Sequence, residues 1–191
     1  MAKLKIYTFP DVVLAEWAAP IARIEKSYFK LADDMLETMY DAPGIGLAAN
    51  QVGVLERILV LDTDYDYDPE TEVVTLKKPM ILINPVIIHR EGSILFSEGC
   101  LSVPEFNADV KRAEKIKVQY QNIDGLTKTL SAEGLLAIAI QHEIDHLEGK
   151  LFIDRLSPLK KELAKKKLRK ERIQRDENPF QVSKKNKEKG F

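Results

Sequence analysis

Two of the chain's three histidines lie four residues apart in the segment His142-Glu143-Ile144-Asp145-His146. Residues four apart on an α-helix lie one turn above each other on the same face, so these imidazoles could bind one metal ion from one side. Glu143 would lie beside that metal, where a carboxylate can accept and deliver a proton. This H-E-x-x-H pattern is typical of metal-assisted hydrolysis, and we favour it over two solvated histidines on a helix surface.

The residues around this segment have the pattern of a helix. Ser131 is a candidate N-cap, Glu133 places negative charge in the first turn, and Gly149 provides a stop. One helical stripe continues from the histidines into apolar residues: Leu135, Ile138, Ala139, His142 and His146. The stripe predicts either ordinary core or the apolar wall of a pocket beside the metal.

A catalytic metal with two histidine ligands needs a third ligand from the protein. The only cysteine, Cys100, follows a glycine that lets the backbone come close. A lone cysteine is commonly a small apolar residue of the core, but a site that lacks a soft donor favours a thiolate ligand here. Cys100, His142 and His146 would then provide three ligands and leave one position for water.

The glycine-rich segment 44–51 (GIGLAANQ) is a second candidate for ligand contact. It matches the dinucleotide-binding pattern G-x-G-x-x-G/A, and Asp62 or Asp64 follows at about the required twenty residues. That pattern needs a strand before the first glycine, whereas the preceding residues have helical periodicity. The space before the next strand is also too short for the required helix. We therefore expect a loop, either a plain one or one that brings backbone and the Gln51 amide close to a ligand.

The composition indicates one domain with an acidic body and a basic end. A chain of 191 residues can form one well-packed domain with some residues left over. Residues 155–191 contain 14 Lys/Arg and 5 Asp/Glu, a net charge of +9, so residues 1–154 carry −10 of the total of −1. The sequence has no apolar run of membrane-spanning length and no secretory signal. One cysteine excludes an internal disulfide, so we expect a cytoplasmic protein without membrane or disulfide partners.

Periodicity predicts an α+β fold, with mostly antiparallel strands packed around the central metal-binding helix. The expected elements are an N-terminal helix over 24–40, strands over 57–62, 73–77, 81–89, 114–121 and 126–131, an acidic surface loop over 62–72 and a turn over 122–125. Ser157 and Pro158 open a last helix. We divide the chain into a catalytic domain (1–157), a basic C-terminal helix (158–176) and a tail (177–191) that we expect to be disordered.

Three segments follow one another in a specific order: GIGLAANQ (44–51), EGCLS (98–102) and QHEIDHLEG (141–149). Together they resemble the three motifs of the peptide deformylase family, and the resemblance extends from the N-terminus to about Leu163. It implies a bacterial metal-dependent hydrolase that removes the N-formyl group from the formylmethionine of nascent polypeptides and releases formate. It also implies one divalent metal, Fe²⁺ in cells, with Zn²⁺, Ni²⁺ or Co²⁺ as substitutes.

The resemblance implies a role for each matching residue. Cys100, His142 and His146 match the metal ligands, and Glu143 matches the catalytic acid/base. Arg112 could pair with Glu98 and orient the second motif, or it could be a solvated arginine.

Other matching residues would contact the substrate. Gln51 and the backbone N–H of Leu101 match donors that stabilise the oxyanion, and Gly46 matches a glycine near the substrate backbone. The methionine side chain would enter a pocket whose walls are Ile45, Leu135, Ile138 and Ala139. Phe96 and Ala139 lie where the size of this pocket could vary.

Two other functions remain open from the residues alone. A zinc endopeptidase of the H-E-x-x-H class takes a third histidine, where this chain has Phe152, or a downstream glutamate such as Glu162 or Glu171. A nucleic-acid-binding module could use the basic residues 160–175, although no aromatic residues lie among them. For a deformylase, the same basic helix would contact the phosphate-rich surface of the ribosome.

Overall fold

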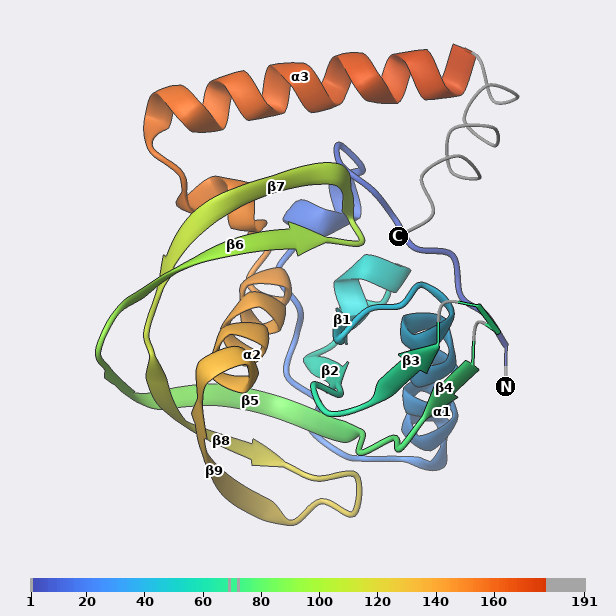
Figure 1. Cartoon of the computed structure of the whole chain (residues 1–191). Helices are drawn as coiled ribbons and strands as arrows, with labels where there is room; N and C mark the ends of the chain where they lie inside the picture. Colours follow the sequence, from blue (N-terminus) through green and yellow to red (C-terminus); the bar gives the residue numbers. More distant parts are fainter. Residues whose placement is uncertain (1, 69, 72, 178–191) are drawn as a thin grey trace.

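The computed structural model describes residues 2–68, 70–71 and 73–177, and its centre is a five-stranded antiparallel sheet (Figure 1). The strands lie in the order β1-β2-β5-β8-β9. Their bounds are β1 Gly46–Ala48, β2 Ile58–Leu61, β5 Met80–Glu91, β8 Lys115–Gln121 and β9 Thr127–Glu133. Two antiparallel ribbons complete the strands: β3 (Asp66–Asp68) with β4 (Val73–Thr75), and β6 (Ile94–Cys100) with β7 (Val103–Arg112).

Three helices are present in the described part of the chain: α1 (Lys26–Asp41), α2 (Gly134–Leu147) and α3 (Pro158–Glu177). Short 3₁₀ segments cover Val12–Ala15, Ala49–Val52 and Phe152–Arg155. Figure 1 shows α2 between the sheet and the β6–β7 ribbon, α1 beside β1 and β2, and α3 outside the ribbon. The predicted α+β class and the antiparallel strand pairing are confirmed.

Helix α2 has a central position in the fold. Every residue of 137–147 is buried, polar and apolar alike, so this helix packs on all sides. The apolar core between α2 and the sheet includes Leu59, Leu82, Val118, Ile140 and Leu147. This burial fixes the position of the two histidines near the end of α2.

Three local predictions need correction. Ser131 is not an N-cap: it lies in β9 opposite Lys117, and α2 begins only at Gly134. The acidic loop 62–72 is not wholly a loop, because β3 pairs with β4 there. Segment 44–51 contains the edge strand β1. In each case pairing with a neighbouring strand decides the local structure, which the local pattern does not reveal.

The last helix is anchored to the body at both ends. Lys161 and Lys165 each lie 2.9 Å from Oδ1 of Asp154, and Arg172 donates a 2.6 Å hydrogen bond to Oγ1 of Thr8. The helix ends one residue beyond the predicted 158–176. The first residue of the predicted disordered tail, Glu177, is the last residue of α3. The rest of that tail lies outside the described residues.

The described residues include no helix that combines the length and the apolar character needed to cross a membrane.

Candidate active site

Strand β6 and helix α2 bring the three predicted metal ligands together. Nε2 of His146 lies 3.2 Å from Sγ of Cys100 and 3.3 Å from Nε2 of His142. The ligand atoms of all three residues lie within 4.8 Å of one another. The i, i+4 spacing on α2 places both rings on one side, and the hairpin turn after β6 places the thiol opposite them.

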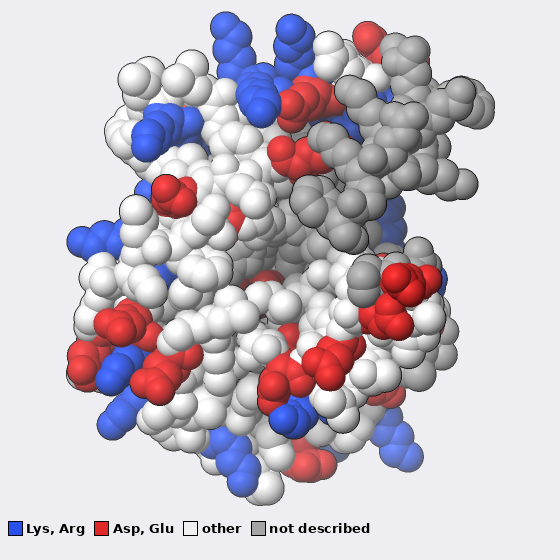
Figure 2. Space-filling model, in the orientation of Figure 1, with Lys and Arg blue, Asp and Glu red and all other residues white. Residues whose placement is uncertain are grey.

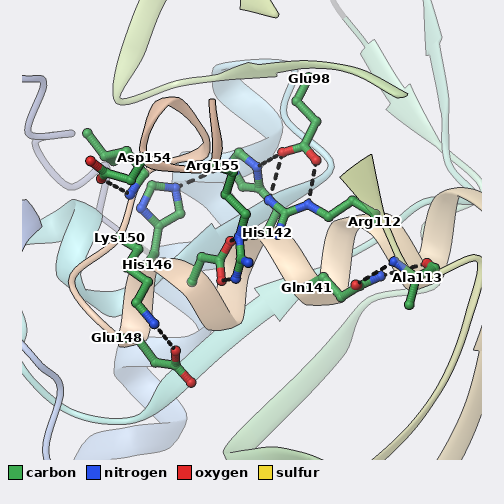
Figure 3. Close-up of polar contacts among 12 residues, drawn as sticks. Glu98, Arg112, Ala113, Gln141, His142, His146, Glu148, Lys150, Asp154 and Arg155 are labelled. Atoms are coloured by element: carbon green, nitrogen blue, oxygen red, sulfur yellow. Dashed lines mark hydrogen bonds and ion pairs between the residues drawn. The ribbon is translucent and has the colours of Figure 1, made fainter. Parts of the chain in front are cut away.

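The donor set fits a divalent cation. Nδ1–H of His142 donates a 2.8 Å hydrogen bond to Oε2 of Glu98 (Figure 3). Its Nε2 therefore faces the second imidazole. A sulfur and two ring nitrogens at these distances direct their lone pairs toward one another, and such groups need a proton or a cation between them. Thiolate and imidazole together are ligands that Zn²⁺ and Fe²⁺ accept in proteins.

The electrostatics of the two histidines differ. Burial opposes positive charge on His142, but the Cys100 thiolate and the Glu98 carboxylate raise its pKa well above the usual value. Burial lowers the pKa of His146 well below the usual value, and the charge of His142 lowers it further. A cation bound among these donors would take the place of a proton on His142.

Glu143 lies beside this group and is buried. Burial raises its pKa to about 7, because a carboxylate loses hydration there. Its Oε2 has no hydrogen-bond partner within the described residues. A Cβ at Gly46 would lie 2.5 Å from its Oε1, so only glycine lets β1 approach so closely. The carboxylate is therefore available to exchange a proton at this place.

The predicted pair of Glu98 and Arg112 is confirmed, and it is part of a larger network. Nε and NH2 of Arg112 donate to the two oxygens of Glu98 at 2.6 and 2.9 Å. NH1 of Arg112 donates to Oδ2 of Asp145 at 2.6 Å, and Nε of Arg155 donates to the same oxygen at 2.7 Å. Arg112 is only 4 % exposed, so it is not a solvated arginine. Sequence reasoning missed the roles of Asp145 and Arg155.

The Gln51 amide is held by both of its ends. Its Oε1 accepts a hydrogen bond from the N–H of Ala48 at 2.8 Å, and its Nε2 donates to Oγ of Ser102 at 3.1 Å. Nε2 also lies 3.6 Å from Sγ of Cys100. The amide nitrogen therefore lies between Ser102 and the candidate metal ligand Cys100. Ser102, which fixes the amide, was not predicted as a site residue, although it lies inside the EGCLS segment.

A pocket of about 470 Å³ opens at these residues. Its lining contains all the predicted wall and contact residues: Ile45, Gly46, Gln51, Phe96, Leu101, Leu135, Ile138 and Ala139. Pro43, Pro104 and Glu105 also line it and were not predicted. Ile138 and Ala139 are buried, whereas Ile45 and Leu135 are partly exposed. Figure 2 shows this face hollowed near its middle, where Figure 1 has α2, β1 and the end of β6.

The residues that a zinc endopeptidase would need lie elsewhere. Phe152 has no donor atom, and its ring stacks on the His142 ring with 6.1 Å between centroids. Glu162 is exposed on α3, and Glu171 on the same helix pairs with Lys167 at 3.7 Å. Neither glutamate belongs to the group of residues that could hold a metal.

Comparison with known proteins gives consistent matches over most of the chain. The family model described as polypeptide deformylase matches residues 3–162. A peptide deformylase of Alkalilimnicola ehrlichii is 49 % identical over 170 residues, covering 89 % of this chain and 91 % of the relative. One of Xylella fastidiosa is 50 % identical over 175 residues, covering 90 % and 98 %.

Solved structures agree with this result. The crystal structure of a peptide deformylase from Legionella pneumophila has a TM-score of 0.79 and 43 % identity, covering 91 % of this chain and 98 % of that one. A peptide deformylase from Ehrlichia chaffeensis in complex with actinonin has a TM-score of 0.79 and 40 % identity, covering 90 % and 98 %.

Proposed function

This chain belongs to the polypeptide deformylase family, and we propose that Cys100, His142 and His146 hold its catalytic metal. The chain is a metal-dependent hydrolase that removes the N-formyl group from N-terminal formylmethionine and releases formate. The observation that supports the ligand assignment is the convergence of one thiol and two imidazoles within 4.8 Å. All three lie beside a buried carboxylate and an apolar pocket.

A divalent metal at this place would supply Lewis-acid chemistry, polarising a carbonyl oxygen and lowering the pKa of a water molecule. Glu143 would accept the proton of the attacking water and deliver it to the leaving amine. Burial raises the pKa of this carboxyl, which favours its holding a proton between the two transfers.

Charge that develops on the formyl oxygen needs hydrogen-bond donors. We assign this role to Nε2–H of Gln51 and to the backbone N–H of Leu101, which lies next to the thiol in the pocket lining. Donors already fixed in place stabilise a transition state without the cost of reorganisation. Ser102 fixes the Gln51 amide and thereby acts as a positioning residue.

The methionine side chain would lie against Ile45, Leu135, Ile138 and Ala139, with Gly46 next to the substrate backbone. Apolar walls of this kind select by size and shape, and each missing methylene should cost about 1–3 kcal/mol in selectivity. The Phe96 ring lies in the same lining. The pocket therefore fits an unbranched apolar side chain better than a charged one.

The test of this assignment is an assay on formyl-Met-Ala-Ser and on the unformylated peptide, paired with metal analysis. We expect formate release only from the formylated peptide, in proportion to bound metal. Cys100→Ser should lose most metal and activity, because a hydroxyl is a poor replacement for a thiolate. Full metal content in this variant would show that the thiol is not a ligand and would revive the peptidase alternative.

We further propose ferrous iron as the native metal, with Zn²⁺, Ni²⁺ or Co²⁺ able to replace it. Support comes from the resemblance and from a donor set that accepts each of these ions. Iron beside a thiolate makes the site sensitive to oxygen. Protein purified without oxygen should retain iron and activity, and protein purified in air should lose both. Equal iron content and equal activity in the two preparations would contradict this proposal.

The free Cys100 also supports a reducing bacterial cytoplasm as the site of action.

Helix α3 is proposed to contact the ribosome. Figure 2 shows Lys and Arg side chains projecting at the top of this face, over α3. Lys166 and Lys170 are exposed one turn apart and form no ion pair within the described residues. Lys161 and Lys165, in contrast, are used to hold the helix on Asp154. The free pair is thus available for phosphate groups.

A matched pair of double variants tests this contact. Replacing Lys166 and Lys170 by alanine should weaken ribosome binding. The slope of log affinity against log salt concentration should also become shallower, by about 1 for each phosphate contact that is lost. Replacing Lys161 and Lys165 should mainly lower stability. Ribosome binding that is independent of salt, or that survives deletion of residues 160–191, would count against the proposal.

A further inference from the structure

A second hollow, of about 400 Å³, shares no lining residue with the pocket at the candidate metal site. It forms where an N-terminal segment, the irregular part of β5 and the C-terminal end of α2 meet. Most of its lining is apolar: Trp17, Pro20, Pro85, Val86, Ile87 and Ile144. The volume lies in the range of small-molecule sites.

A buried guanidinium opens into this hollow. Arg57 is only 8 % exposed, and its NH2 donates a hydrogen bond to the Pro85 carbonyl at 3.1 Å. Its guanidinium carbon lies 5.5 Å from the centre of the Trp17 ring. Its other side-chain nitrogens donate no hydrogen bond within the described residues, and they are not among the fully buried atoms that lack a partner. Since Arg57 lines the hollow, these donors are available to a ligand there.

No carboxylate of the described residues forms an ion pair with Arg57. Glu148, the acidic residue of the lining, instead pairs with Lys150 at 2.8 Å. Burial lowers the pKa of Arg57 and the more distant charge of Glu148 raises it. Arg90 adds a second cation to the lining. A buried cation is unfavourable without an anion in contact, and Glu148, the one carboxylate of this lining, forms no ion pair with Arg57.

We propose that this hollow binds a small carboxylic acid with an aromatic or branched apolar body. The planar fork of Arg57 matches the two oxygens of a carboxylate, which a lysine would not do. The Trp17 ring and the side chains of Val86 and Ile87 would cover the apolar body. This inference does not depend on the function of the metal site, because the two pockets share no residue.

Trp17 is the only tryptophan of the chain, so its fluorescence reports directly on this hollow. The full-length protein is titrated with phenylacetate and, separately, with the neutral phenylacetamide. Phenylacetate should give a saturable change at a concentration about tenfold or more below that of the amide, because a hydrogen bond to a charged group is the stronger one. Equal effects of the two compounds, or no saturation with phenylacetate, would overturn the proposal.

Two variants on β5 provide a matched comparison. Val86 and Ile88 are 55 % and 53 % exposed, but only Val86 lines the hollow. Val86→Glu should weaken phenylacetate binding at least about tenfold by charge repulsion, whereas Ile88→Glu should leave it unchanged. Both variants should retain formate release, which shows that they fold. Similar affinities in the two variants would also overturn the proposal. Arg57→Lys, which keeps the charge and loses the fork, should bind more weakly than the unchanged chain.

Discussion

Glu98 accepts a hydrogen bond from Nδ1–H of His142 at 2.8 Å. Through this contact, one carboxylate fixes both the tautomer and the plane of a proposed ligand ring. The same carboxylate receives two hydrogen bonds from Arg112, whose third contact is Asp145 on α2. The ring orientation is therefore determined by a chain of buried charges that begins on β7 and ends on the metal-binding helix.

Replacing Glu98 by alanine should affect both the metal and the fold. We expect metal affinity to fall about 10–100-fold, because the ring loses its partner. Stability should fall by about 3–5 kcal/mol, because Arg112 would be left as a buried charge without this partner. Metal titration against a competing chelator and urea denaturation measure the two effects. Asp109→Ala, at an exposed position of the same ribbon outside the pocket lining, is the control. Unchanged metal affinity would show that the hydrogen bond does not position His142.

Replacing Glu143 by glutamine should separate metal binding from turnover. The variant keeps the size of the side chain but not its ability to accept a proton, so the rate of formate release should fall about 10²–10⁴-fold. Metal content should remain that of the unchanged chain, because Glu143 is not among the three converging donors. Glu148→Gln, just after the end of α2, is the control. A variant with near-normal turnover would exclude Glu143 as the proton-transfer group.

Replacing Gln51 by alanine should remove one donor from the formyl oxygen. Loss of such a donor raises the barrier by about 2.7–4 kcal/mol, a decrease of about 10²–10³ in kcat. Ser102→Ala should have a smaller effect, because the amide stays in place through Ala48. Steady-state assays of both variants measure this difference. A Gln51 variant that loses only substrate affinity, with kcat unchanged, would place the amide outside the oxyanion site.

The chemistry-bearing residues could be predicted because their spacing has a direct geometric meaning. His142 and His146 share a helix face at any position of the helix in the fold, and the single Cys100 leaves no alternative thiol. Three of the predicted wall residues, Leu135, Ile138 and Ala139, lie on the same stripe of α2, which by itself predicted either core or a pocket wall. These features are local or unique in the sequence, and tertiary contacts do not alter them.

Other features depend on partners that are distant in sequence. The β6–β7 ribbon carries Cys100 and was not predicted. Strand β6 lacks a clear alternating pattern, whereas the alternation of β7 over 106–111 is present in the sequence and was overlooked. Arg155 reaches Asp145 only because the 3₁₀ segment Phe152–Arg155 returns the chain to α2. Ser131 would be a reasonable N-cap in isolation, but pairing with β8 places it in a strand. Long-range pairing of this kind leaves no signal in one sequence.

Replacing Gly46 by alanine should disturb the site although it removes no functional group. The added Cβ would lie 2.5 Å from Oε1 and 2.9 Å from the carboxyl carbon of Glu143, so the carboxylate must move. Because small displacements of a catalytic group are costly, we expect kcat to fall about 10²-fold. At Gly44 a Cβ would meet the flexible end of Leu101 at 2.9 Å, so Gly44→Ala should cost less. Equal rates for the unchanged chain and Gly46→Ala would show that Glu143 tolerates the displacement.

Asp154 should contribute a part of the stability that depends on pH. Burial alone would raise the pKa of Asp154, but the N–H of Leu151 at 3.0 Å and the ammonium groups of Lys165 and Lys161 lower it below its usual value. A carboxyl group with a lower pKa in the folded state stabilises that state above its unfolded pKa of about 3.9. The contribution is lost as the pH falls from there through the folded pKa.

Asp154→Asn should therefore lower stability by about 1 kcal/mol at pH 7. The difference from the unchanged chain should shrink below about pH 4. Urea denaturation at pH 7 and at pH 3.5 measures this change, and Asp33→Asn, at an exposed position of α1, is the control. A difference that stays constant, or grows, as the pH falls would show that the Asp154 carboxylate does not stabilise the junction between α2 and α3.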